Sequence, residues 1–216
     1  MFVGRRMTRN LVTATEETSV LAARQLLLEK EIDQLPVLKG EKLVGIVTDR
    51  DIRQNMASPA STLSIHELNY LLSRMKVGEI MTQRVVTVSP DTPIEEAIRQ
   101  INRNHFNSLP VVVHDNKLVG IITSCDLLNV LLEVMGVDLP SSRLEVVICN
   151  HTGDFSEITK IINQLGLTIL SMFSYNSREG KGERTLVVRV NTTDVTPLKK
   201  ELESAGYRIT EESSSL

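Results

Sequence analysis

Residues 43–51 read Leu-Val-Gly-Ile-Val-Thr-Asp-Arg-Asp, and residues 118–126 read Leu-Val-Gly-Ile-Ile-Thr-Ser-Cys-Asp. Two further shared features lie upstream of each stretch, a Leu-Pro-Val triplet at 35–37 and 109–111 and a Met-Thr pair at 7–8 and 81–82. The offset between the copies is 74 residues at these upstream features and 75 residues within the two quoted stretches. Constant spacing across matched positions indicates two copies of one structural unit.

Each copy has the pattern of a strand, a helix, two strands and a second helix. In the second copy the predicted segments are a strand at 85–88, a helix capped by Thr92 with Pro93 at its first position, strands at 109–113 and 117–123, and a helix at 126–135. The helical spacing of Ile94, Ala97, Ile98 and Ile101 predicts one buried stripe. The first copy repeats this order with a helix near 18–30, strands at 35–38 and 42–48, and a helix from Asp51.

One such unit cannot bury its apolar surfaces alone, so we expect the two copies to pack as a pseudo-two-fold pair. The domain boundaries that follow are 1–57 for repeat one, 58–76 for an inter-repeat linker helix, and 77–136 for repeat two. The apolar residues of the linker predict that it packs on the pair or on a second subunit.

The doubled pattern Met-Thr, Leu-Pro-Val and Leu-Val-Gly-Ile-Val/Ile-Thr-x-x-Asp resembles a tandem pair of CBS domains, the Bateman module. The resemblance covers about residues 1–136, nearly two thirds of the chain. It implies an α/β (α+β) fold in which two β-α-β-β-α repeats enclose a cleft.

Polar groups follow the same strand in both copies. Thr48 and Asp51 are three residues apart at a strand-to-helix junction, as are Thr123 and Asp126. Unpaired backbone N–H groups at a helix start favour an anion such as phosphate. A Thr hydroxyl can bond a phosphate or ribose oxygen, and an Asp carboxylate can accept both ribose hydroxyls. The other interpretation is that these residues are helix caps.

The CBS resemblance favours nucleotide binding, because in such pairs an adenosyl group lies in the cleft between repeats. By similarity, the Asp holds the ribose and the Thr reaches ribose or phosphate. Ile46 and Ile121 would pack on the base. The opposite wall would be formed by Thr8, Val12, Thr82 and Val86.

The two motifs differ in their cations, since Arg50 of the first stands where Cys125 stands in the second. Family members that hold AMP or ATP often place a basic residue just before the Leu-Pro-Val strand, where this chain has Asp33-Gln34 and Asn107-Ser108. The cations left to meet a phosphate are Arg50, Arg5, Arg6, Arg9, Arg84, Arg103 and His105. The first site is therefore expected to suit phosphate, and the second a less charged adenosyl ligand, unless Arg50 is only a solvated surface charge.

A polar linker at 137–143 leads to a third segment, 144–216, whose pattern β-α-β-β-α-β is ferredoxin-like. This segment resembles an ACT domain, whose signature loop Asp-x-Pro-Gly-x-Leu is matched here only at its Gly. The resemblance implies dimerisation or the binding of an amino acid. The candidate effector loop is Asn150, His151, Thr152, Gly153 and Asp154.

Bulk composition excludes several classes of protein. A net charge of −3, an aromatic content of 3% and the absence of Trp argue against nucleic-acid binding and against a polybasic membrane binder. Apolar runs are too short for a spanning helix, and no signal peptide is recognisable, so we expect a cytoplasmic protein. The two cysteines have no zinc-type spacing, so they are expected to be reduced thiols and no metal site is predicted.

The domain order of two CBS repeats and one ACT domain resembles the bacterial acetoin-utilisation regulators of AcuB type. The resemblance implies regulation without a catalytic cofactor, through an adenosine-containing ligand of the AMP, ADP, ATP or S-adenosylmethionine type, in a homodimer with a possible protein partner. Two alternatives remain, a scaffold with vestigial ligand sites and an enzyme. The sequence carries no Ser-His-Asp, Cys-His, Walker or zinc set to support the last.

Overall fold

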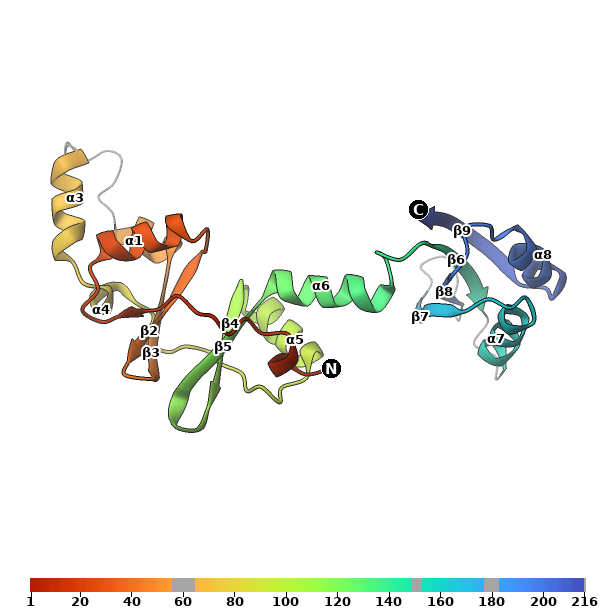
Figure 1. Ribbon diagram of the computed structural model, residues 1–216, viewed down its shortest axis with the longest axis horizontal. Coiled ribbons are helices and arrows are strands. Elements are labelled where there is room, and N and C mark those ends of the chain that lie inside the picture. Colours follow the sequence, from red (N-terminus) through yellow and green to blue (C-terminus); the bar gives the residue numbers. More distant parts are fainter. Residues whose placement is uncertain (56–64, 149–152, 177–182, 216) are drawn as a thin grey trace. The chain divides into compact units, whose positions relative to one another are not determined.

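The fold comes from a computed structural model, which describes residues 1–55, 65–148, 153–176 and 183–215 (Figure 1). The chain divides into two compact units, Met1–Leu127 and Leu128–Leu216. No helix in the described ranges is both long and apolar enough to cross a bilayer.

The first unit contains both repeats, joined by a linker helix, except for the part of the last helix of repeat two that follows Leu127. Repeat one consists of a short 3-10 turn Val3–Arg5, β1 Ala14–Thr15, α1 Val20–Glu29, β2 Gln34–Lys39, β3 Lys42–Thr48 and α2 Asp49–Asn55. The linker contributes α3 Ile65–Arg74. Repeat two consists of α4 Val77–Ile80, α5 Ile94–Asn104, β4 Ser108–Val113, a 3-10 turn His114–Asn116, β5 Lys117–Thr123 and α6 Ser124–Met135.

The two repeats share one five-stranded sheet with the order β1-β2-β3-β5-β4. The repeats meet where β3 pairs with β5 through Lys42 and Lys117. Nearby, the Asn116 side-chain amide donates to the Leu43 carbonyl at 2.6 Å. At the other end of the interface, the Gln34 amide donates to the Ser108 hydroxyl. Gln34 and Ser108 are equivalent positions of the two repeats. Their bond therefore joins the repeats across the pseudo-two-fold axis that the sequence predicts.

The segment before each repeat pairs with the other repeat. Thr8 and Ile121 exchange two backbone hydrogen bonds of 2.9 and 3.0 Å, and Ile46 and Thr82 exchange two of 3.0 and 2.9 Å. The amino-terminal turn likewise bonds to repeat two, since the Val3 amide donates to the Thr92 carbonyl at 2.9 Å. The repeats are therefore interleaved, since each contributes backbone hydrogen bonds to the other.

This interleaving explains the glycine of each Leu-Val-Gly-Ile stretch. A Cβ added at Gly45 would collide with Met81 Sδ and would lie 3.1 Å from the Thr82 carbonyl oxygen. A Cβ at Gly120 would collide with Met7 Sδ in the same way. The Met of each Met-Thr pair thus needs the glycine of the opposite repeat, and the glycine marks a crossing backbone.

Several local expectations differ from the structure. The strand expected at 85–88 is reduced to a single bridge between Val88 and Val111. The chain turns away there because the Thr92 hydroxyl accepts a 3.0 Å bond from the Ser89 amide, so Thr92 closes a turn and α5 starts at Ile94. Ile98, expected in the buried stripe, is 44% exposed, since α5 turns its other face to the sheet.

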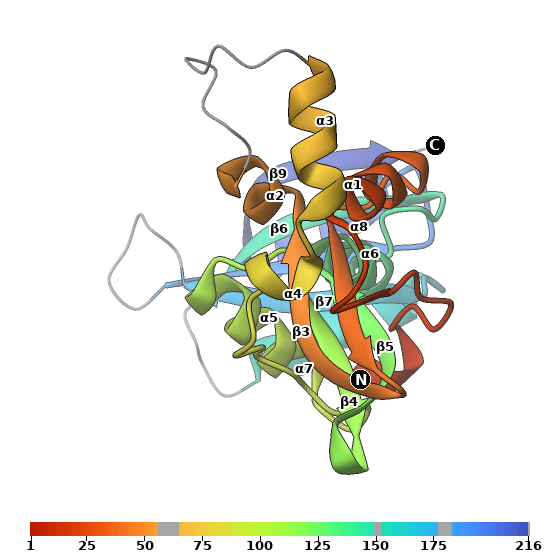
Figure 2. The same ribbon diagram turned by 90° about the vertical axis from the view of Figure 1, so that its left-hand side faces the viewer.

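The linker helix packs on the pair of repeats, which is one of the two arrangements that the sequence predicts. Leu72 of α3 is 1% exposed and belongs to the core of repeat one with Val20, Ala23 and Leu27 of α1. The two helices lie side by side in both ribbon views (Figure 2). The part of the predicted linker at 58–64 lies outside the described residues.

The second unit has the β-α-β-β-α-β order. Its elements after the end of α6 are β6 Ser141–Ile148, α7 Asp154–Gln164, β7 Ile169–Asn176, β8 Arg184–Val190, α8 Thr196–Ser204 and β9 Arg208–Ser215. The antiparallel sheet has the order β7-β8-β6-β9, which is the ferredoxin-like topology. The connector expected at 137–143 is shorter, because β6 pairs with β8 and β9 from Ser142 and Ser141 onward.

The core of this unit lies between the sheet and its two helices. Ile158 and Ile162 of α7 and Leu198 and Leu202 of α8 are fully buried against inward residues of β6 and β8. Phe155, which the helical pattern places inward, is 44% exposed at the start of α7.

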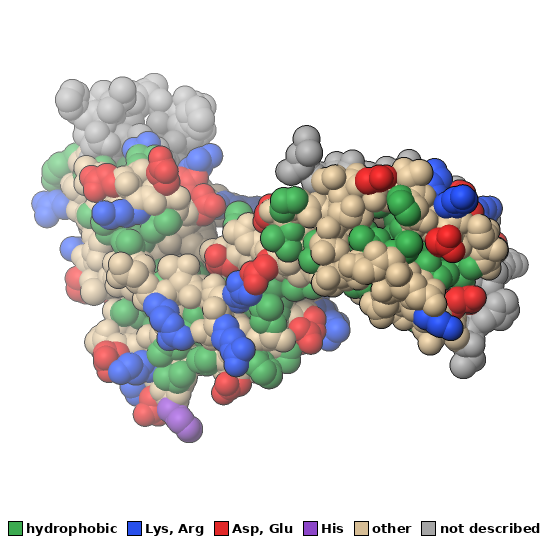
Figure 3. Space-filling view, turned by 45° about the vertical axis from the view of Figure 1, so that its right-hand side comes forward, with side chains coloured by type: hydrophobic (Ala, Val, Ile, Leu, Met, Phe, Trp, Pro, Cys, Tyr) green, Lys and Arg blue, Asp and Glu red, His purple; other side chains and the backbone are tan. Residues whose placement is uncertain are grey.

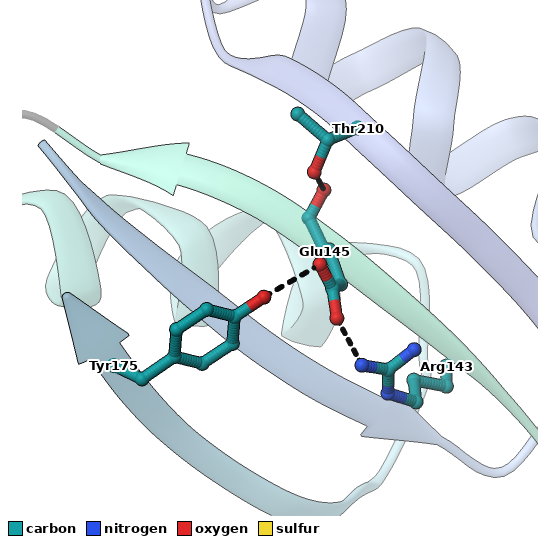
Figure 4. A network of polar contacts seen from close by, with 4 residues as sticks. All are labelled: Arg143, Glu145, Tyr175 and Thr210. Carbon is teal, nitrogen blue, oxygen red and sulfur yellow. Dashed lines mark hydrogen bonds and ion pairs between the residues drawn. The ribbon is translucent and has the colours of Figure 1, made fainter. Parts of the chain in front are cut away.

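A polar network links three strands of this sheet (Figure 4). Tyr175 of β7 donates its hydroxyl to Glu145 Oε2 at 2.9 Å, and Arg143 forms an ion pair with Glu145 Oε1. The Thr210 hydroxyl of β9 donates to the Glu145 carbonyl at 3.5 Å. The hydrogen bond to Glu145 raises the pKa of the Tyr175 hydroxyl, and partial burial adds to the effect. The network connects β6, β7 and β9 in addition to the backbone pairing that sets their register.

Candidate functional site

The Thr and Asp of the first motif form a reciprocal cap at the start of α2. Asp51 Oδ2 accepts bonds from the Thr48 amide at 2.9 Å and from the Thr48 hydroxyl at 2.7 Å. The Thr48 hydroxyl in turn accepts a bond from the Asp51 amide at 3.2 Å. The sequence leads to this geometry because a Thr followed three residues later by an acidic residue can satisfy both backbone donors.

The second motif repeats the cap at the start of α6. Asp126 Oδ2 accepts from the Thr123 amide and hydroxyl, both at 2.8 Å, and the Thr123 hydroxyl accepts from the Asp126 amide at 3.1 Å. In both motifs the second carboxylate oxygen, Oδ1, accepts no hydrogen bond within the described part of the chain. The capping interpretation is therefore confirmed, and it leaves one oxygen of each carboxylate for another role.

A first cavity of about 400 Å³ lies beside the first motif. One wall is the end of β3 and the start of α2, with Ile46, Thr48 and Asp51. The other wall comes from repeat two. Its lining residues include Thr82, Arg84, Val86, His105 and Phe106.

A second cavity of about 460 Å³ lies beside the second motif. It has the same construction with the repeats exchanged, since Ile121 and Thr123 come from repeat two. The segments from repeat one contribute Thr8, Asn10, Val12, Glu31 and Ile32. Both volumes fall in the range of small-molecule sites, which is about 300–1,000 Å³.

The structure brings the predicted site residues together in two groups. Ile46, Thr48, Arg50, Asp51, Thr82 and Val86 all line the first cavity. Ile121, Thr123, Thr8 and Val12 line the second, where Cys125 stands in the place of Arg50. Asp126 is not among the lining residues of the second cavity, although its carboxylate is held in the same cap as that of Asp51.

Of the cations that could meet a phosphate, the first cavity is lined by Arg50, Arg84 and His105. Arg9 donates instead to the Gly4 carbonyl at 2.8 Å. Neither Arg5, Arg6 nor Arg103 lines either of the two cavities as described.

Sequence reasoning named His105 in the turn before β4 but missed its neighbour Phe106, and it missed Glu31 and Ile32 in the equivalent turn before β2. Glu31 and Ile32 line the second cavity, and the equivalent His105 and Phe106 line the first. Both Glu31 and His105 have left-handed backbone angles, with φ of 51° and 55°. The repeat offset of 74 was the available signal, because it aligns these two turns residue by residue.

The candidate effector loop of the second unit is only partly described. Asn150, His151 and Thr152 lie outside the described residues. Gly153, with φ of 126°, precedes α7, and Asp154 is its first residue. Among the described residues there is no group of three or more His, Cys, Asp or Glu side chains that could hold a metal ion.

The interleaved repeats and paired cavities define a tandem-repeat architecture with two clefts, and the family comparison agrees with it. A family model for the CBS domain matches residues 3–58 and 77–133, which together make up more than half of the chain. The protein belongs to the CBS domain family.

Curated relatives match this pair of repeats but differ in their length and in their names. A homoserine O-acetyltransferase of Methanohalobium evestigatum is 34% identical over 122 residues, which are 56% of this chain and 22% of that enzyme. A CBS domain-containing protein of Dictyostelium discoideum is 32% identical over 137 residues, which are 63% of this chain and 94% of that protein. The chain therefore spans about a fifth of the length of the first relative and nearly all of the second.

Solved CBS pairs are similar in fold. The protein CBSX2 in complex with AMP is 35% identical with a TM-score of 0.52, covering 62% of this chain and 98% of that one. The CBS pair of MJ0100 with 5′-methylthioadenosine and S-adenosyl-L-methionine is 26% identical with a TM-score of 0.50, covering 61% and 95%. A protein of Vibrio cholerae described as an acetoin utilization protein (AcuB) is 27% identical with a TM-score of 0.53, covering 65% and 98%.

Proposed function

We propose that this protein is a non-catalytic regulator that binds an adenosine-containing ligand in the cleft between its CBS repeats. The observation that carries the proposal is the composition of each cavity. An apolar Ile, a Thr and the end of a capped helix from one repeat face a wall supplied by the other repeat. A ligand in either cavity would contact both repeats at once.

The residues of the first cavity suit the parts of an adenosine nucleotide. Ile46 and Val86 offer apolar surface for the base. Asp51 Oδ1 is available to accept the ribose hydroxyls, while Oδ2 stays in the cap with Thr48. Arg50 and Arg84 offer positive charge for a phosphate. The complexes of CBSX2 with AMP and of MJ0100 with adenosyl compounds support this class of ligand.

Regulation follows from the position of the ligand between two repeats. A ligand that touches both walls stabilises one relative arrangement over another by its differential affinity. The enzyme names among the relatives give no support for catalysis by this chain, since the first of them is matched over only 22% of its length. A scaffold with vestigial sites is the alternative, and it predicts no binding.

For the second unit we propose an ACT-like role in homodimerisation or amino-acid sensing. Its ferredoxin-like sheet supports this role, as do exposed apolar side chains, which include Leu139, Phe155, Phe173 and Tyr175. Figure 3 shows apolar side chains gathered on the face of this unit that is turned to the viewer. Such surface is typical of a contact with another molecule.

The test of nucleotide binding uses adenosine, because every candidate ligand contains it. Asp51→Asn and Asp126→Asn each keep a carbonyl oxygen for the Thr amide, so the cap survives, and each turns an amide donor toward the ribose. Alanine at either position would also remove the cap, at about 1 kcal/mol of stability. Loss of the charged acceptor should weaken adenosine binding at the altered cavity by about 10–100-fold.

Isothermal calorimetry on the full chain provides the measurement. We expect two equivalents of adenosine for the unaltered protein, one retained equivalent in each single variant, and none in the double variant. Asp115→Asn, in the exposed turn before β5, is the matched control and should bind as the unaltered protein does. Equal adenosine binding in all variants would refute the assigned role of the carboxylates, and no binding at all would favour the vestigial scaffold.

A further inference from the structure

We infer that the two cavities take adenosine ligands of different charge: the first a phosphorylated nucleotide, the second an adenosine whose 5′ substituent carries no phosphate and is neutral or cationic, such as a sulfonium. The inference rests on the proposed function and goes beyond it by assigning a ligand class to each cavity. It rests on a comparison of equivalent positions, which the repeat makes possible.

Three pairs of equivalent lining positions differ in the same direction. Arg50 of the first cavity corresponds to Cys125 of the second. Arg84 corresponds to Asn10, and His105 corresponds to Glu31. Each exchange replaces a basic side chain by a neutral or acidic one. All six side chains are exposed, so packing of the core does not account for the difference.

The backbone at these positions is alike, which makes the comparison one of side chains. Glu31 and His105 both lie in the left-handed region directly after a helix, with φ of 51° and 55°. Asn10 and Arg84 both lie two residues after the Thr that pairs with the opposite repeat. The same scaffold thus presents different charges to the two cavities.

Two acidic residues line the first cavity besides Asp33. Asp49, which corresponds to the neutral Ser124 of the second cavity, is in an ion pair with Arg53 at 2.6 Å. Asp51 is held in the same cap as its counterpart Asp126, so it does not distinguish the two motifs. Arg50 and Arg84 form no ion pair with any described residue. Asp33 lines both cavities and therefore does not distinguish them.

In the second cavity no cation offsets the carboxylates among the described lining residues. Glu31 and Asp33 line it, and no Lys, Arg or His is found among its described lining residues. A phosphate carries a charge of about −1.5 to −2 at pH 7, so two carboxylates and no cation disfavour it. The same carboxylates attract a sulfonium or an ammonium group.

The thiol of Cys125 makes the second cavity separately observable, because it is exposed and lines that cavity. The rate of Cys125 alkylation by iodoacetamide, followed by peptide mass spectrometry, therefore reports whether the second cavity is occupied. S-adenosylmethionine at about ten times its Kd should slow this reaction about tenfold. AMP at concentrations that saturate a calorimetric titration should leave the rate unchanged.

Exchanging the charges should exchange the response. In Asn10→Arg/Glu31→His, which keeps Cys125, AMP should now protect the thiol. The backbone accepts this change, since His already occupies the equivalent left-handed position. The reciprocal variant Arg84→Asn/His105→Glu should lose about 10–100-fold in AMP affinity, while protection of Cys125 by S-adenosylmethionine persists.

The outcomes separate this inference from the proposed function. If AMP protects Cys125 of the unaltered protein as well as S-adenosylmethionine does, the cavities are not sorted by charge, although adenosine binding still stands. The same conclusion follows if the exchanged variants respond as the unaltered protein does. If adenosine itself neither binds nor protects Cys125, the proposed function fails as well.

Discussion

The two cavities of the CBS pair have the same frame and different charges. The cap of Thr48 and Asp51 and that of Thr123 and Asp126 agree within 0.1 Å in each of their three hydrogen bonds. The side chains around them differ at Arg50, Arg84 and His105, whose counterparts are not basic. The comparison teaches that the repeated motif builds the frame, while residues outside it determine which ligand fits.

The largest effect on stability is expected where the Met of one repeat packs against the Gly of the other. Gly45→Ala places a Cβ against Met81 Sδ and the Thr82 carbonyl, and Gly120→Ala does the same against Met7 and Thr8. Each substitution should lower the free energy of unfolding by about 1–3 kcal/mol, as overpacking of a tight site does. Chemical denaturation measures this free energy, and the two variants should lose similar amounts if the repeats share one frame.

A double-mutant cycle identifies the cause of that loss. In Gly45→Ala/Met81→Ala the shorter opposing side chain removes the collision with sulfur. The double variant should therefore be more stable, by about 0.5–3 kcal/mol, than the sum of the two single losses predicts. Strictly additive effects would show that the Met does not impose the glycine. A large loss in only one repeat would show that the frames are not equivalent.

The frame was largely predictable from sequence because its determinants are local and repeated. Leu-Pro-Val, Leu-Val-Gly-Ile and the 74-residue offset predicted both strand pairs and both following helices. The sequence could not show that Met81 approaches Gly45, because that contact depends on how the second repeat crosses the first.

The rest of the site depended on side-chain direction and on tertiary packing. Periodicity assigned Ile98 and Phe155 to buried faces, yet both are 44% exposed, since helix spacing alone does not fix which edge of a stripe meets the core. Asp126 stays a predicted ligand residue: it is held in the same cap as Asp51, although it is not among the residues that line the second cavity. Glu31 was missed because an acidic residue in a turn does not by itself indicate a ligand site. It becomes informative only when the repeat aligns it with His105.

The two motifs also lead into different elements, which predicts a second and smaller difference. The motif beside the first cavity leads into α2, which ends at Asn55. The motif beside the second cavity leads into α6, which runs to Met135. The Met135 carbonyl accepts a 2.9 Å bond from the Ser171 hydroxyl of β7. A ligand in the second cavity should therefore stabilise α6 and β7 more than a ligand in the first does.

Hydrogen exchange with mass spectrometry checks this expectation. S-adenosylmethionine should slow amide exchange in α6 and β7 about fivefold, which corresponds to a coupling of about 1 kcal/mol. AMP should slow exchange mainly in α2. Equal protection of α6 by both ligands would contradict this expectation, because it would show that α6 does not respond to the second cavity in particular. The second unit would then receive no signal that distinguishes the two ligands.

The most direct test of two differently charged cavities is a titration of AMP into protein that already holds one equivalent of S-adenosylmethionine. Calorimetry should show one further equivalent of AMP, with an affinity within about threefold of that for the free protein, a shift of under about 0.7 kcal/mol. Displacement of S-adenosylmethionine by AMP, with no added stoichiometry, would contradict the account, because it would show one shared site where two distinct cavities are proposed.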